Sequence, residues 1–420
     1  MERHVRQRLT DSQYLNPNQP ATIQGKKYLQ FFALTMLVLM VSISTQSHAA
    51  SDDQGGSSYT ENRFAQTNDR AVTSELPYGL HCAPLRQQLS QLTGVMMRFD
   101  HLDRLRDDAR AGELGLVGLL GEPPHDLRTQ IANLQALSPT PVFFASDEES
   151  RSVQRLDSLI YRLPGTRGML RAGAAEVTRI FNEYGASMRA LGLHISFAPV
   201  ADLGRGPGIG YRSFGTDADS VISMVNAVTD GFLSAGVLPV VKHFPGHGAA
   251  SADSHDGRAT TPPLHELTEQ IRVFAQVLNR DVAVMVGHLE TPELTRGQPA
   301  SLSSPAIDGL LRQSLGFGGL VITDALGMSA ITDYHDQASA GVKAIKAGAD
   351  IALVSNLKAQ RRLLDRLEQA VGQGDLSSER VAASLERVLK AKSALIEANP
   401  EHSNRQGLVC SDPVYTSQLP

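Results

Sequence analysis

Eight short apolar runs, most of them rich in β-branched residues, alternate with helix-like segments along this chain of 420 residues. Buried parallel strands read as such continuous runs, and strands that alternate with helices are typical of parallel sheets. The runs are residues 94–99, 116–120, 141–146, 195–200, 238–241, 282–287, 319–323 and 349–355. We therefore predict an α/β fold, a (β/α)8 TIM barrel that forms a single catalytic domain. The alternative is a doubly wound open sheet, but no glycine-rich phosphate turn follows the first run.

The segments between these runs carry apolar residues three and four positions apart, which is the spacing of an amphipathic helix. They cover residues 175–191, 220–233, 264–278, 305–315 and 338–347. Residues 359–395 are rich in Arg, Leu, Glu and Ala, and we expect two further helices there that close the barrel.

The first part of the chain, residues 1–49, has the features of an export signal. Lys26 and Lys27 precede the apolar run 31–43, and small residues at 47–49 suit cleavage. The apolar run is shorter than the roughly 20 residues that a membrane-spanning helix needs. We expect the signal to be removed, with no stable membrane insertion, and the protein to be exported, either periplasmic or secreted. An uncleaved N-terminal anchor is the alternative.

The remaining chain divides by composition. Residues 50–76 are polar and lack an apolar period, which predicts a disordered linker. We expect the barrel over residues 77–398 and a polar C-terminal tail over 399–420. Cys82 and Cys410 lie on either side of the folded region, so a disulfide and two independent thiols are both open. A formal net charge of −5 gives no reason to expect a nucleic-acid partner, and we expect a monomer.

The densest polar cluster follows the fifth apolar run. Lys242-His-Phe-Pro-Gly-His-Gly248 and Asp253-Ser-His255 place a cation, three imidazoles and a carboxylate within 14 residues. Polar side chains also follow other runs: Asp147, Glu148, Glu149, Arg151, Arg155, Asp202, Arg205, Arg212, His288 and Asp324. The C-terminal ends of the strands carry the active site in (β/α)8 barrels, so we predict a site at that rim.

Asp324 follows the seventh run directly, so a fixed strand should aim it inward, and Ala325 and Gly327 leave space around it. A carboxylate held in this way suits nucleophilic attack on an anomeric carbon, with a covalent glycosyl-enzyme as the intermediate. The alternative is an Asp that caps the next helix.

Such a nucleophile needs a partner that protonates the leaving oxygen and later activates water. His255 can do both if Asp253, two residues earlier, orients the imidazole and stabilises its charge. The small residues between Gly248 and Asp253 suit a loop that closes over substrate. A metal site built from His243, His247, Asp253 and His255 is the alternative, but the spacing matches no standard zinc pattern. We expect no metal and no cofactor.

These motifs resemble glycoside hydrolase family 3, in particular its single-domain bacterial β-N-acetylhexosaminidases. The cluster at 242–255 resembles the acid/base loop of the family, and Ile322-Thr-Asp-Ala-Leu-Gly-Met328 resembles its nucleophile strand. Phe197-Ala-Pro-Val-Ala-Asp202 and Tyr211-Arg-Ser-Phe-Gly215 resemble substrate-binding segments. Further matches in the right order are Pro299-Ala-Ser-Leu-Ser303 and Leu315-Gly-Phe-Gly-Gly319, so the resemblance covers about residues 85–395.

The resemblance implies Asp324 as nucleophile and His255, paired with Asp253, as acid/base. It also implies a set of residues that hold the sugar: Asp147, Arg155, Arg212, Lys242, His243 and Met328. The implied activity is that of a retaining exo-β-N-acetylglucosaminidase acting on peptidoglycan fragments or chitooligosaccharides. The chain has no Trp, so the sugar would be held by hydrogen bonds and charge rather than by stacking on indole rings.

The chain departs from the family pattern at Ser150, Arg151 and Ser152, where the family usually has two glycines and an arginine. Loss of glycine removes backbone freedom beside the sugar. Two alternatives therefore stay open: a glycoside phosphorylase, in which a His acid/base lets phosphate approach, and a non-catalytic sugar-binding protein.

Overall fold

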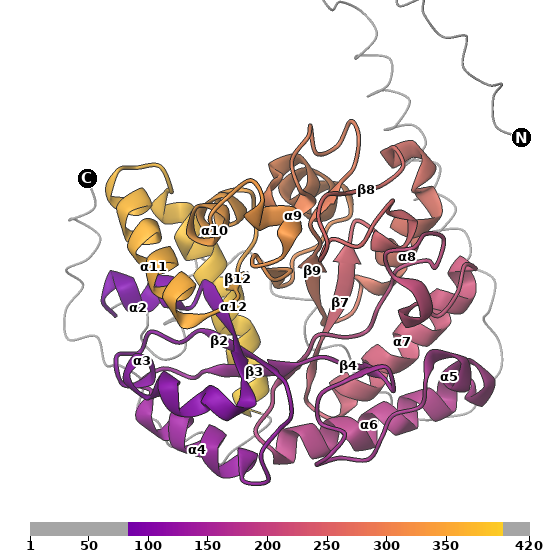
Figure 1. Ribbon diagram of the computed structural model, residues 1–420, viewed down its shortest axis with the longest axis horizontal. Coiled ribbons are helices and arrows are strands. Elements are labelled where there is room, and N and C mark those ends of the chain that lie inside the picture. The colour runs from indigo at the N-terminus through magenta and orange to yellow at the C-terminus, as the bar shows by residue number, and fades with distance from the viewer. Residues whose placement is uncertain (1–82, 398–420) are drawn as a thin grey trace, which may run out of the picture. The chain divides into compact units, whose positions relative to one another are not determined.

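The structure, a computed structural model, describes residues 83–397, and within them eight parallel strands form one sheet (Figure 1). The strand order is β11-β9-β7-β6-β3-β2-β1-β12. From β1 to β11 the seven strands lie side by side in sequence order, and β12 lies next to β1. The strands are β1 (Thr93–Arg98), β2 (Leu116–Leu120), β3 (Phe143–Ser146), β6 (Ile195–Ser196), β7 (Leu238–Phe244), β9 (Ala283–Val286), β11 (Val321–Thr323) and β12 (Ala352–Val354). Each of the eight predicted runs overlaps one of these strands: six strands lie within their runs, β1 begins one residue before its run, and β7 extends three residues beyond its run.

The sheet closes on itself between its first and last strands. β1 pairs with β12 in parallel register, with Thr93 opposite Ala352. A parallel bridge between Ile322 and Ile351 then joins the end of β11 to the chain that leads into β12. The predicted (β/α)8 barrel is therefore confirmed, and the open doubly wound sheet is excluded.

Helices surround the barrel (Figure 1). They are α2 (Leu85–Ser90), α3 (Arg106–Arg110), α4 (Leu127–Leu137), α5 (Thr166–Ala172), α6 (Ala174–Ala190), α7 (Ala218–Ser234), α8 (Thr268–Val277), α9 (Ser329–Thr332), α10 (Gln337–Lys346), α11 (Leu357–Gly372) and α12 (Ser378–Glu397). The predicted segment 264–278 splits into a short 3-10 turn (Leu264–Glu266) and α8. The segment predicted at 305–315 is a π-helix (Pro305–Ser314), and the N–H of Leu315 bonds the carbonyl of Leu310, five residues earlier.

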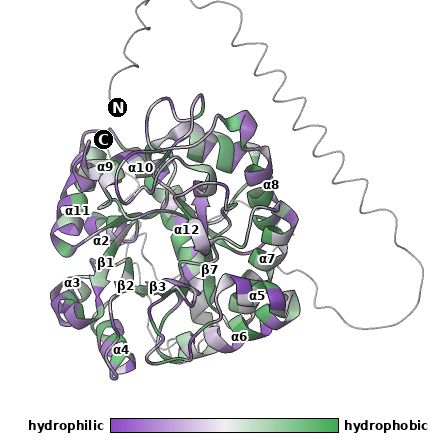
Figure 2. Ribbon diagram, turned by 45° about the vertical axis from the view of Figure 1, so that its right-hand side comes forward, coloured by the Kyte–Doolittle hydropathy of each residue, from purple (hydrophilic) through white to green (hydrophobic). Residues whose placement is uncertain are grey.

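The main core lies inside the barrel, and its members are Leu116, Phe143, Ala145, Ile195, Phe197, Val240, Ala283, Met285, Leu320, Ile322, Ile351, Leu353 and Val388. Each comes from a strand or its edge except Val388, which belongs to α12. Figure 2 shows that the surrounding helices carry both hydrophobic and hydrophilic residues, as expected for helices that bury one face against a sheet.

The last helix, α12, closes the N-terminal end of the barrel. The Nζ of Lys392 donates to Gln91 Oε1 at 2.6 Å and to two carbonyls that precede strands, Gly115 O at 2.9 Å and Pro141 O at 2.6 Å. It also lies 4.8 Å from the centre of the Phe143 ring. With this end sealed, the opposite rim is left for a ligand.

Several predictions concern residues outside the described range: the signal at 1–49, the linker at 50–76, the tail at 399–420, and the pairing of Cys82 with Cys410. Within residues 83–397, no helix has the length and apolar character needed to cross a membrane.

Candidate active site

The predicted site residues lie at the C-terminal rim of the barrel, because each comes at or just after the end of a strand. Asp147 follows β3, Lys242 and His243 are in the last part of β7, and Asp324 follows β11. Asp202 comes soon after β6, near a bridge between Val200 and Lys242 that extends the pairing of the two strands.

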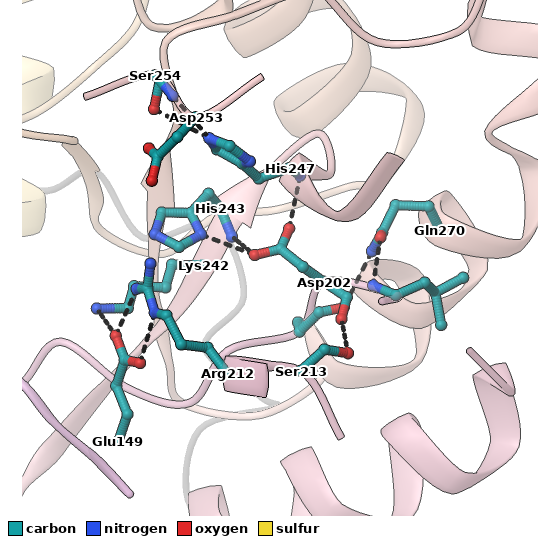
Figure 3. Close-up of polar contacts among 12 residues, drawn as sticks. Glu149, Asp202, Arg212, Ser213, Lys242, His243, His247, Asp253, Ser254 and Gln270 are labelled. Carbon is teal, nitrogen blue, oxygen red and sulfur yellow. Dashed lines mark hydrogen bonds and ion pairs between the residues drawn. The ribbon is translucent and has the colours of Figure 1, made fainter. Parts of the chain in front are cut away.

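Two cations and two carboxylates form a buried cluster at this rim, which we call the ion cluster (Figure 3 shows three of its members). Its members are Asp147, Glu149, Arg212 and Lys242. The Nζ of Lys242 lies 2.9 Å from Asp147 Oδ1 and 2.6 Å from Glu149 Oε1. The guanidinium of Arg212 binds both oxygens of Glu149, at 2.9 and 2.7 Å. The structure thus brings together three predicted sugar-binding residues around one additional carboxylate.

The charges in the ion cluster stabilise one another. Burial alone would raise the pKa of Glu149, but Lys242 and Arg212 lower it to about 2. Burial alone would lower the pKa of Lys242, but Asp147 and Glu149 raise it. Glu149 and Lys242 are therefore ionised at neutral pH, and they present fixed charges and donors to a ligand.

Arg155 reaches the same region from the hairpin β4 (Glu148–Ser150) and β5 (Val153–Gln154). Its Nη2 lies 3.5 Å from Asp147 Oδ2, at the limit of a hydrogen bond. Its buried Nε has no hydrogen-bond partner among the described residues. A buried donor without a partner is costly unless a ligand completes it.

Asp202 holds two histidines in place from a fully buried position (Figure 3). One carboxylate oxygen lies 2.7 Å from His243 Nδ1, and the other accepts the backbone N–H of His247 at 2.6 Å. Burial alone would raise the pKa of Asp202, but His243 lowers it. Gln270 fixes the backbone on both sides of Asp202, since it accepts the following N–H at 2.8 Å and donates to the preceding carbonyl at 3.0 Å.

Asp324 lies at the floor of the site, partly accessible to solvent but surrounded by protein. Its Oδ1 accepts the N–H of Ala325 at 2.7 Å. Burial alone would raise the pKa of Asp324, whereas His243, His288, the Ala325 N–H and Lys242 lower it to about 2. The group is therefore an anion at neutral pH, as a nucleophile requires.

His288 follows β9 and is held from both sides of its ring. Its Nδ1 lies 2.8 Å from Ser301 Oγ, and its Nε2 lies 3.0 Å from the carbonyl of Ala325. Burial lowers the pKa of His288, so the ring is neutral at neutral pH. At neutral pH it supports the turn that carries Asp324 without a full charge, and it lowers the pKa of Asp324 only in the acidic range where the ring is protonated.

The loop that contains Asp253 and His255 contacts the segment that follows Asp324. The Nδ1 of His255 lies 2.8 Å from Asp253 Oδ1, which also accepts the His255 N–H at 3.0 Å. The side chain of His255 is 62% exposed, and that of Asp253 is 41% exposed. Ser254 between them is buried, and its carbonyl accepts the N–H of Ala330 at the start of α9. Asp253 and His255 therefore contact each other, and Ser254 between them contacts the segment that follows the turn carrying Asp324.

Met328 ends that same turn, immediately before α9. It is mostly buried, and its N–H donates to the carbonyl of Ala325 at 3.1 Å.

Among residues 83–397 no group of three or more His, Cys, Asp or Glu side chains is arranged to hold a metal ion. The predicted alternative that used His243, His247, Asp253 and His255 therefore has no geometric support in this part of the chain.

The departure at residues 150–152 forms the turn of the hairpin between β4 and β5. The hydroxyls of Ser150 and Ser152 lie 3.1 Å apart, and the N–H of Arg151 bonds the carbonyl of Pro164. None of the three residues has a positive φ. The turn thus needs no glycine, and the hairpin still carries Glu149 and Arg155 to the site.

Sequence reasoning did not assign a role to Glu149, Asp202 or Ser254. Glu149 had a detectable signal, because it is the last residue of an acidic triplet at a strand end near two predicted cations. Asp202 was noted at a strand end, but its contacts with two histidines depend on how neighbouring strands lie in space. Nothing in the sequence distinguishes Ser254 from an exposed loop serine.

The barrel is similar in sequence to known proteins. Residues 85–391 match the family described as the glycosyl hydrolase family 3 N-terminal domain. The chain is 43% identical over 267 residues to "Beta-hexosaminidase LpqI" of Mycobacterium tuberculosis, covering 60% of this chain and 69% of that protein. It is 33% identical over 278 residues to a beta-hexosaminidase of Xylella fastidiosa, covering 63% of this chain and 81% of that protein.

Solved structures give the same result. A glycosyl hydrolase of the GH3 family from Mycobacterium smegmatis superposes with a TM-score of 0.69 at 39% identity, covering 74% of this chain and 98% of that one. A glycoside hydrolase family 3 beta-N-acetylglucosaminidase from Paenibacillus superposes with a TM-score of 0.71 at 34% identity, covering 74% of this chain and 63% of that one. The chain belongs to glycoside hydrolase family 3.

Proposed function

We propose that this glycoside hydrolase is a retaining exo-β-N-acetylglucosaminidase. The observation that carries the proposal is an ionised Asp324 at a strand end together with a His255–Asp253 pair on a loop that contacts the segment following Asp324 through Ser254 and Ala330. A nucleophile and an acid/base from two separate elements are what a double displacement at an anomeric carbon requires.

In the first step, the Asp324 carboxylate attacks the anomeric carbon while the bond to the leaving oxygen breaks. His255 in its protonated form gives its proton to that oxygen. Asp253 stays ionised because the N–H groups of His255 lower its pKa against the effect of burial, so it stabilises the imidazolium. The product of this step is a glycosyl ester on Asp324 and a free alcohol.

In the second step, neutral His255 accepts a proton from water as the oxygen of that water attacks the anomeric carbon. The ester bond to Asp324 breaks, and the sugar leaves with its original β configuration. The exposed position of His255 suits this step, since water can reach the imidazole from outside the barrel.

The sugar is held by the ion cluster, Arg155 and His243. The Nδ1 of His243 is occupied by Asp202, which leaves the Nε2 for the ligand. The buried Nε of Arg155 has no partner within residues 83–397 and is a donor for a hydroxyl group. Met328 contributes apolar contact beside Asp324. Fixed donors of this kind recognise hydroxyls and an amide without aromatic stacking.

The relatives named β-hexosaminidases and β-N-acetylglucosaminidase support an N-acetylated sugar as the substrate. We propose peptidoglycan fragments or chitooligosaccharides as the natural glycans, and an exported location reached through the signal at residues 1–49. The enzyme would act as a monomer without cofactor.

The test uses nitrophenyl β-N-acetylglucosaminide. Proton NMR should show the β-anomer of N-acetylglucosamine as the first product, and the α-anomer as first product would contradict a retaining mechanism. Asp324→Ala should lose at least 100-fold, roughly, in kcat. Sugar 1-phosphate formed on addition of phosphate would instead identify a phosphorylase.

A further inference from the structure

Ser254 differs from the rest of the loop on which it lies. The side chain of its neighbour His255 is 62% exposed and that of Asp253 is 41% exposed, whereas Ser254 itself is 1% exposed. A serine buried between two solvent-facing residues is held by specific contacts, because a buried hydroxyl without a partner would be unfavourable. Those contacts decide where the flanking dyad stands.

The contacts of Ser254 reach two different elements. Its Oγ lies 3.0 Å from His247 Nε2, and its N–H points to the same nitrogen at 3.4 Å (Figure 3). Its carbonyl accepts the N–H of Ala330 at 3.3 Å. One residue therefore joins the loop both to the end of β7 and to the start of α9, just after the turn that carries Asp324.

His247 is itself fixed and neutral. Its backbone N–H binds Asp202, and its ring packs edge-on against His243, with the ring centres 5.6 Å apart. Burial, reinforced by His243, lowers the pKa of His247. Because the backbone N–H of Ser254 can only donate, the Nε2 of the neutral ring is the acceptor. Gly208 is needed here, since a side chain at that position would collide with the imidazole.

We propose that Ser254 is a positioning residue. By binding His247 and Ala330 it holds the acid/base loop in the position from which His255 can protonate the leaving group. This inference rests on the proposed function, because it assigns the effect of Ser254 to the acid role of His255. Through Asp202, the support of the loop is continuous with the support of His243. The positions of the acid and of the sugar-binding His243 therefore both depend on the carboxylate of Asp202.

The consequence is selective. A poorly placed acid matters most when the leaving oxygen needs a proton, and matters little when the leaving group departs readily without one. Loss of the Ser254 hydroxyl should therefore reduce activity on glycosides of weakly acidic alcohols and spare glycosides of acidic phenols. A general loss of folding or sugar binding would reduce both equally.

The experiment measures kcat/KM for phenyl and dinitrophenyl β-N-acetylglucosaminides in the full chain. Ser254→Ala should lose about tenfold on the phenyl glycoside, the scale of one hydrogen bond, and less than about twofold on the dinitrophenyl glycoside. Ser254→Thr keeps the hydroxyl and should restore the phenyl activity. Melting temperatures should match, which separates positioning from unfolding.

Two control variants complete the test. Ser251→Ala alters another serine of the same loop, whose Oγ accepts the N–H of Thr260 at 3.2 Å, and should leave both rates unchanged. His255→Ala sets the leaving-group dependence expected for loss of the acid. Dependence in His255→Ala but equal losses, or none, in Ser254→Ala would overturn the inference alone. No dependence in His255→Ala would overturn the acid assignment and the inference together.

Discussion

Glu149 and Lys242 form a salt bridge of 2.6 Å in which each side chain is only 3% exposed. Arg212 binds the same carboxylate through two N–H groups. Removal of one partner from a buried ion pair leaves an uncompensated charge. The resulting loss of stability is larger than the net stabilisation that the intact pair provides. Stability of the fold and the shape of the sugar site therefore depend on one carboxylate.

Glu149→Gln should lower the free energy of unfolding by about 3–5 kcal/mol, because Lys242 and Arg212 lose their shared anion. It should also raise KM, since both cations are free to move. Urea denaturation and nitrophenyl glycoside kinetics measure the two effects. Glu176→Gln makes the same change in an exposed pair with Arg179 and should alter neither. A stable Glu149→Gln protein with normal KM would contradict this role.

Asp253→Asn should reduce kcat/KM on the phenyl glycoside by roughly tenfold or more, because the imidazolium of His255 loses its anionic partner. The measurement is kcat/KM at neutral pH on the phenyl and dinitrophenyl glycosides, and the loss should be larger on the phenyl glycoside. Asp256→Asn, on the same loop, should keep the wild-type values on both.

Glu148 should make stability depend on pH. Burial raises its pKa to about 7, although the hydroxyls of Tyr184 and Ser146 oppose this. Between its unfolded pKa and about 7 the folded state binds the extra proton, so stability falls as pH rises through this window. Glu148→Gln should therefore gain up to about 3 kcal/mol relative to wild type between pH 4 and pH 8, measured by urea denaturation. A constant difference would contradict the shift.

Lys392 should make the free energy of unfolding rise with pH, the opposite of the effect of Glu148, and at higher pH. Burial lowers its pKa to about 7, so between about 7 and its unfolded value the unfolded state binds the proton that the folded state lacks. Wild-type stability should rise with pH relative to Lys392→Met, by about 1 kcal/mol per pH unit. Lys390→Met, which alters an exposed lysine on the same helix, should track wild type. Because Lys392 lies at the far end of the barrel, KM should not change.

The sequence was sufficient for the architecture because each strand of a buried parallel sheet is itself apolar. The eight runs could be recognised singly, without knowing which strands pair. The polar residues at their C-terminal ends were predictable for the same reason, since closure of the barrel places all such ends at one rim.

The contacts within the site were not predictable in this way. That Glu149 faces Lys242 and Arg212, while Glu148 turns to Tyr184, depends on the geometry of a three-residue strand. The burial of Ser254 depends on His247 and α9, which lie on different elements. The π-helix at Pro305–Ser314 has the same apolar spacing as an α-helix, so periodicity could not separate them.

The pairing of β1 with β12 has a consequence for how the protein folds. It joins Thr93 to Ala352, residues separated by most of the described chain, and α12 follows β12 in the sequence. Contacts of such long range are slow to form because the intervening loop must first lose its entropy. The barrel therefore cannot close during synthesis until the chain has been made as far as β12, and α12 is the last of the described elements to be made.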